Sequence, residues 1–161
     1  MSAVMQEAAG RKDVLPGFVP TATQPTGSDA ITVLLVDDDD QVRGLCHSLL
    51  TENGFTVLEA HNGLEAILTS IRHKGAIDLL ITDLEMPGMS GLDLGWAFHE
   101  FRPGISVLYI SGSGWETAGG QLPADSAFLA KPFTPGELLK AVTDTLLCGH
   151  RAAPNTICSF A

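Results

Sequence analysis

Five polar residues of this chain come directly at the ends of short apolar runs: Asp37, Asp38, Asp83, Ser111 and Lys131. Three carboxylates pressed together would repel one another, and their pKa values would rise unless a cation lay among them. Oxygen-only ligands suit a hard ion such as Mg²⁺, which completes its coordination with water and phosphate oxygens. With a hydroxyl and an ammonium group beside them, such carboxylates could hold a phosphoryl group.

Asp83 is the candidate nucleophile of this set, because a carboxylate can attack phosphorus and form an aspartyl phosphate. The apolar run 77–82 before it is short, which is typical of a buried strand. A proline and two glycines follow at once and predict a sharp turn. Ligands of open parallel sheets bind just beyond the carboxyl ends of the strands. Asp83 is therefore expected at such a position, where Lys131 and Ser111 can converge on its product.

The apolar runs alternate with helical patterns, which predicts an α/β fold with a parallel sheet and helices on both faces. Strands are expected at five ranges: 31–36, 55–59, 77–82, 105–110 and 127–130. Five strands suit the flavodoxin-like, doubly wound order 2-1-3-4-5. In that order the first and third strands are neighbours, which places Asp37 and Asp38 beside Asp83.

Four segments carry apolar residues at helical spacing, the pattern of an amphipathic helix that packs one face on a core. The stripes are Val42, Leu45, Cys46, Leu49 and Leu50; Leu64, Ile67, Leu68 and Ile71; Leu94, Ala97, Phe98 and Phe101; and Leu138, Leu139, Val142, Leu146 and Leu147. Asp39 or Asp40 and Asn62 are expected caps, and 134–137 reads as a capping box. Gly95 should weaken its helix by roughly 1 kcal/mol relative to Ala.

Composition places the chain among globular proteins and excludes several classes. The net charge of −10 argues against a nucleic-acid-binding surface. Three cysteines without C-x-x-C spacing fit reduced thiols. The sequence contains no signal-peptide pattern and no apolar run approaching the ~18 residues of a membrane span, so a cytoplasmic location is expected. Residues 1–29 are predicted to be a flexible extension, 30–148 the folded domain and 149–161 a tail.

Four motifs resemble the receiver domain of two-component response regulators. They are VDDDD at 36–40, DLLITDLEMPGMSG at 78–91, ISG at 110–112 and KPF at 131–133. The match covers about residues 31–147, with the motifs in the right order and spacing. The resemblance implies a stand-alone receiver that takes part in a phosphorelay. It is expected to act by contact with another protein, because no output domain follows.

The resemblance also implies a role for each matching residue. Asp83 looks like the phosphoacceptor, and Asp37 and Asp38 look like the acidic pair that holds Mg²⁺. The backbone carbonyl of Glu85 would be a third protein ligand to the metal. Ser111 looks like the hydroxyl that moves to the phosphoryl oxygen.

The cation that pairs with the phosphoryl group would be Lys131, and its bond to Pro132 is expected to be cis, as is frequent in the family. Phe128 matches the aromatic switch position, where Tyr is common. Phe cannot make a hydroxyl contact, so a switch there would rest on packing. The segment 112–126 contains four glycines and a proline. It predicts a short or irregular fourth helix and an atypical partner surface, with Trp115 as a candidate anchor.

The expected partners are a sensor histidine kinase or phosphotransfer protein and an unidentified downstream protein, without nucleic acid or membrane. The chain is not expected to be an enzyme beyond self-phosphorylation and autodephosphorylation. Two alternatives stay open. One is a receiver that never takes phosphate and serves as a binding module. The other is a haloacid dehalogenase-like phosphatase, since 38–42 fits its D-x-D-x-V motif; that family needs a further acidic motif after the lysine, and no acidic pair follows Lys131.

Overall fold

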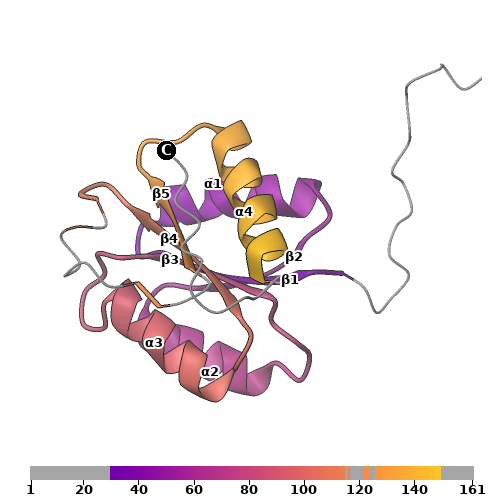
Figure 1. Ribbon diagram of the computed structural model, residues 1–161, viewed down its shortest axis with the longest axis vertical. Coiled ribbons are helices and arrows are strands. Elements are labelled where there is room, and N and C mark those ends of the chain that lie inside the picture. Colours follow the sequence, from indigo (N-terminus) through magenta and orange to yellow (C-terminus); the bar gives the residue numbers. More distant parts are fainter. Residues whose placement is uncertain (1–29, 115, 117–121, 124–125, 150–161) are drawn as a thin grey trace, which may run out of the picture.

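The computed structural model describes residues 30–114, 116, 122–123 and 126–149 (Figure 1). The predicted extension 1–29, residues 150–161 of the predicted tail and the candidate anchor Trp115 lie outside these residues. Among the described helices, none is both long enough and apolar enough to cross a membrane.

Among the described residues, five parallel strands form a single sheet: β1 (Thr32–Val36), β2 (Thr56–Ala60), β3 (Leu79–Asp83), β4 (Ser106–Ser111) and β5 (Ser126–Ala130). Their order is β2-β1-β3-β4-β5, so the predicted fold class is confirmed. Strands β1, β3 and β4 are buried along their whole length, which explains their nearly continuous apolar sequence. The register pairs Val36 with Thr82, so Asp37 comes next to Asp83.

In the part of the chain that the structure describes, four α-helices cover the sheet: α1 (Asp40–Glu52), α2 (Gly63–Arg72), α3 (Gly91–Phe101) and α4 (Pro135–Gly149). Helices α1 and α4 lie on one face, and α2 and α3 lie side by side on the other (Figure 1). Among its described residues, the β4–β5 crossover contains no α-helix, in agreement with the irregular fourth helix that the glycines predict. Helix α4 extends to Gly149, one residue into the predicted tail.

The helix starts follow the predicted caps. Asp39 is the N-cap of α1 and accepts from the amide of Gln41 at 2.9 Å. Asn62 caps α2 in the same way. The capping box before α4 is reciprocal: the amide of Thr134 donates to the Glu137 carboxylate at 2.6 Å, and the amide of Glu137 donates to the Thr134 hydroxyl at 3.3 Å.

Helix α2 differs from the expectation, because its apolar stripe faces solvent. Leu64, Leu68 and Ile71 are 63%, 42% and 65% exposed. The residues that α2 buries are the small ones: Gly63, Ala66 and Ser70. The expectation that this stripe would pack on the core is therefore wrong for these three residues, whereas the fourth, Ile67, is half-buried against the core as expected. Small residues let the helix lie close to the sheet, whose own side chains fill that part of the core.

Glycines play a similar part in α3. A Cβ atom at Gly95 would overlap the hydroxyl of Tyr109, and one at Gly91 would overlap the carbonyl oxygen of Asp83. The helix-weakening glycine at position 95 is therefore explained by the close approach of a fully buried tyrosine from β4. Trp96 is 48% exposed on the outer side of the same helix.

The cysteines differ from one another. Cys46 is a free thiol buried in the core under α1, as expected, and burial raises its pKa to about 11. Cys148, near the end of α4, is disulfide-bonded. The expectation of reduced thiols throughout is wrong for this residue; the C-x-x-C criterion tests only for closely spaced pairs.

Candidate functional site

Three carboxylates meet at the carboxyl edge of the sheet, where β1 and β3 end side by side. Oxygen atoms of Asp37, Asp38 and Asp83 all lie within 4.8 Å of one another. Asp37 and Asp83 are only 2% and 8% exposed, whereas Asp38 is exposed. A set of oxygen-only ligands that is partly open to water fits Mg²⁺, which keeps several waters when it binds to protein.

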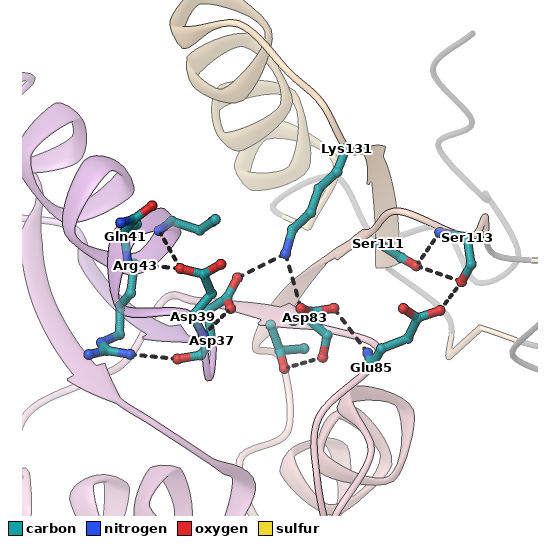
Figure 2. A network of polar contacts seen from close by, with 11 residues as sticks. Asp37, Asp39, Gln41, Arg43, Asp83, Glu85, Ser111, Ser113 and Lys131 are labelled. Carbon is teal, nitrogen blue, oxygen red and sulfur yellow. Dashed lines mark hydrogen bonds and ion pairs between the residues drawn. The ribbon is translucent and has the colours of Figure 1, made fainter.

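Lys131, which follows β5, reaches across this edge and links two of the acids (Figure 2). Its Nζ donates to Oδ2 of Asp83 at 3.0 Å and to Oδ2 of Asp37 at 3.2 Å. Burial alone would lower the pKa of Lys131, but the two carboxylates together outweigh it and raise that pKa. The lysine is therefore a fixed positive charge at the position expected for it.

Burial has the opposite consequence for Asp37. Removal from water raises the pKa of this carboxyl, and the amide of Asp39 and the charge of Lys131 offset the effect only in part. The negative charge of Asp37 is thus held at a free-energy cost in the folded protein. A divalent cation beside it would stabilise that charge.

Backbone amides orient both buried acids. The amide of Glu85 donates to Oδ1 of Asp83 at 2.9 Å, and the amide of Asp39 donates to Oδ1 of Asp37 at 2.9 Å. The loop after each strand therefore holds the carboxylate that precedes it. The role of the Glu85 carbonyl as a metal ligand stays a prediction.

Ser111 is the last residue of β4, on the other side of Asp83 from Asp37, and it is completely buried. Its hydroxyl accepts from the amide of Ser113 at 3.1 Å and lies 3.2 Å from the Ser113 hydroxyl, which in turn donates to the Glu85 carboxylate (Figure 2). Ser111 is thus held by its own loop, and this loop is tied to the loop that follows Asp83.

Sequence reasoning missed two side chains at this edge. Arg43 of α1 is buried and donates from Nη1 to the carbonyl of Asp37 at 2.7 Å, while also pairing with Asp40. The i,i+3 spacing of Arg43 and Asp40 could have suggested that pair. Ser113 and its bond to Glu85 had no signal, because loop geometry brings together residues 28 positions apart.

The remaining predictions about nearby residues can now be compared with the structure. The Lys131–Pro132 bond is cis, as expected. Asp39 serves as a cap and Asp40 pairs with Arg43, so neither belongs to the carboxylate cluster. Phe128 is half-buried against the core on the α2/α3 face.

A cavity of about 380 Å³ lies at the opposite, amino-terminal edge of the strands, where Asp78, Arg102 and Ser106 contribute to its lining. None of the five site residues lines it. The Asp78 carboxylate accepts from the amide of Thr32 at 2.8 Å, and Arg102 donates to backbone carbonyls, so their polar groups serve the fold.

The doubly wound sheet and its acidic carboxyl edge define a receiver of two-component signalling. The family model described as the response regulator receiver domain matches residues 33–143. The chain therefore belongs to the response regulator receiver domain family.

Individual relatives agree with this assignment. The chain is 36% identical over 130 residues to sensor kinase CckA of Brucella abortus (strain 2308), covering 80% of this chain and 14% of that protein. It is 34% identical over 121 residues to transcriptional regulatory protein CpxR of Escherichia coli (strain K12), covering 73% of this chain and 50% of that protein. The chain thus spans half or less of the length of these relatives.

Solved structures give the same result. A response regulator receiver protein from Sinorhizobium medicae WSM419 is similar with a TM-score of 0.67 and 33% identity, over 75% of this chain and 98% of that one. The receiver domain of the hybrid histidine kinase CckA is similar with a TM-score of 0.61 and 34% identity, over 71% of this chain and 98% of that one.

Proposed function

We propose that this receiver accepts a phosphoryl group on Asp83 from the phosphohistidine of a histidine kinase or phosphotransfer protein, in a Mg²⁺-dependent reaction in the cytoplasm. The observation that carries the proposal is the convergence of Asp83 with two further acids and Lys131 at one edge of the sheet. Relatives that include a sensor kinase and a hybrid-kinase receiver support a donor of this type.

The chemistry follows from the charges at the site. A carboxylate oxygen of Asp83 attacks phosphorus, an oxygen–phosphorus bond forms, and the phosphorus–nitrogen bond to the donor histidine breaks. Mg²⁺ held by Asp37, Asp38 and the Glu85 carbonyl would neutralise phosphoryl oxygens. Lys131 already contacts Asp83 and can stay beside it while it pairs with the new negative charge.

Ser111 supplies the link from this event to the surface. The phosphoryl group adds about −1.5 to −2 charges and three strong acceptor oxygens. To donate to one of them, the Ser111 hydroxyl would exchange its contacts with Ser113, and the β4–β5 loop would move with it. A changed loop then presents a different surface to a downstream protein. In this proposal the chain is a signalling protein, and beyond accepting the phosphoryl group from its donor it carries out only self-phosphorylation and autodephosphorylation.

Mass spectrometry tests the acceptor. Incubation with a small phosphodonor and Mg²⁺ should add one phosphoryl group that is lost in base. Asp83→Asn should abolish the gain in mass, and Asp93→Asn, at an exposed acid of α3, should leave it intact. A gain that survives Asp83→Asn would disprove the assignment. The metal is tested by calorimetric titration, in which Asp38→Ala should weaken Mg²⁺ binding while Asp93→Ala does not.

The two alternatives are not favoured. A binding module that never takes phosphate has no need for the full set of acids, hydroxyl and lysine at one edge. In a dehalogenase-like phosphatase the carboxylates of the D-x-D-x-V motif would carry the chemistry. Here the second of these carboxylates, Asp40, pairs with Arg43 and lies outside the carboxylate cluster.

A further inference from the structure

The outward face of α2 is an apolar stripe, defined here as Leu64, Leu68 and Ile71. These residues recur at the i, i+4 and i+7 spacing of one helix face, and each is 42% exposed or more. The side of α2 that meets the sheet buries only the small residues Gly63, Ala66 and Ser70, with the half-buried Ile67 beside them. An amphipathic helix normally turns its larger apolar side chains inward. Their outward position therefore indicates a surface that another protein covers.

Opposite charges flank the stripe at its two ends. Glu65 lies in the first turn of α2 and Arg72 in the last. Seven residues are about two helical turns, so both lie on the same side of the stripe, about 10.5 Å apart along the axis. Glu65 is held in place by His61, whose amide and ring nitrogen lie 2.7 Å from the carboxylate. The helix thus has an acidic amino end and a basic carboxyl end along one edge of its apolar stripe.

This pattern is complementary to itself when the helix is reversed. In an antiparallel pair related by a twofold axis, a residue near one end of a helix faces a residue near the other end of its partner. Leu68 lies near the middle of the stripe and would face its own copy. Leu64 of each copy would face Ile71 of the other, and Glu65 would face Arg72. We propose that a second copy of this chain covers the stripe, through antiparallel packing of α2 on α2.

Neighbouring parts of the molecule can enlarge this surface. Arg102, just after α3, donates from Nη2 to the Ser70 carbonyl at 2.6 Å, which ties the end of α3 to the last turn of α2. Phe101, the residue before it, is 45% exposed. Helix α2 has ten residues, about 15 Å in length. A helix of this length buries less surface than the about 800 Å² per partner that is typical of stable interfaces. The dimer should therefore be weak and concentration-dependent.

Sedimentation velocity on the full chain tests the proposal. The sedimentation coefficient should rise from the monomer toward the dimer value between about 10 μM and 1 mM, the range of weak association. Leu68→Glu, which places two like charges at the twofold axis, should keep the protein monomeric throughout. Leu45→Glu is the matched control, because Leu45 is 58% exposed on α1, on the opposite face of the sheet. It should leave the dimer unchanged.

Charge reversal tests the orientation. Glu65→Arg and Arg72→Glu should each weaken the dimer at least threefold, and the double variant should restore it. Thermal unfolding of each variant checks that the monomer remains folded, since Glu65 also binds His61. A wild-type chain that stays monomeric to 1 mM overturns the proposal. A dimer that survives Leu68→Glu, or a double variant no tighter than either single one, does so too. Association that appears only after deletion of residues 1–29 would also overturn it, and would assign the stripe to that segment.

Discussion

Helix α2 packs on its face of the sheet in a different way from α1 and α4 on the opposite face. On the α1/α4 face, α4 buries Leu138, Val142 and Leu146, and α1 buries Cys46 and Leu50. On the α2/α3 face, α2 buries only glycine, alanine and serine, Ile67 is half-buried against the core, and Leu64, Leu68 and Ile71 point outward. An apolar stripe therefore shows that a helix has two different sides, but it does not show which side faces the core.

Close approach accounts for the difference. The strands present Leu34, Leu80 and Tyr109 to the α2/α3 face, and these already fill much of the space under the helices. Helix α3 adds the fully buried Leu94 and Phe98 to this core, whereas α2 comes close to the sheet with small residues at the contact. At Gly63 a Cβ atom would already lie 2.7 Å from Sδ of Met89, in the loop after Asp83.

The largest expected effect compares the two faces directly. Leu138→Ala should lower the free energy of unfolding by about 2–5 kcal/mol, because a completely buried side chain is replaced by a cavity. Leu68→Ala, on the outward face of α2, should cost less than about 1 kcal/mol, since surface changes are small. Urea unfolding at low protein concentration, where the proposed dimer is dissociated, measures both. Equal losses would show that α2 packs its stripe on the core.

The next effect concerns glycine at the contacts. Gly91→Ala should lower the free energy of unfolding by about 1–3 kcal/mol, because the added methyl group overlaps the backbone of Asp83, which cannot move aside. Gly44→Ala in α1 is the matched control: apart from its chain neighbours and the backbone of its own helix, no atom lies within 4 Å of its added Cβ. It should raise stability by about 0.5–1 kcal/mol through helix propensity. A stabilising Gly91→Ala would contradict close approach as the reason for this glycine.

The smallest expected effect concerns Asp37, at the carboxyl edge of the sheet between the two helical layers. Burial raises the folded-state pKa of Asp37 above its ordinary value of 3.8, so the folded protein binds more protons than the unfolded chain between the two values. Stability contributed by this group therefore falls as pH rises through the folded pKa.

Asp37→Asn should thus be more stable than the wild type at pH 7 in a chelating buffer, and the gain should vanish below pH 3.8. Thermal unfolding across this pH range measures it. Adding Mg²⁺ should reverse the order, because the ion stabilises only a protein that can bind it. A gain that persists in acid would assign the effect to packing.

Much of the candidate site could be predicted from the sequence. Asp37, Asp83, Ser111 and Lys131 each end or follow an apolar run, and parallel strands deliver their carboxyl ends to the same edge. The contacts of Glu85 with Ser113 and of Arg43 with the Asp37 carbonyl could not be predicted. They depend on how two loops and a helix pack, and no local pattern reports that.

The sequence by itself determined which segments form strands and helices, the order of the strands and the edge at which the acids gather. It could do so because the spacing of apolar residues, the helix caps and the turn residues are all local features of the sequence. In addition, the crossover connections between parallel strands allow few topologies. Only the tertiary structure decided that α2 turns its stripe outward and that Gly95 makes room for Tyr109. Both depend on the space left between layers, which is a property of all the packed side chains together and of no single segment.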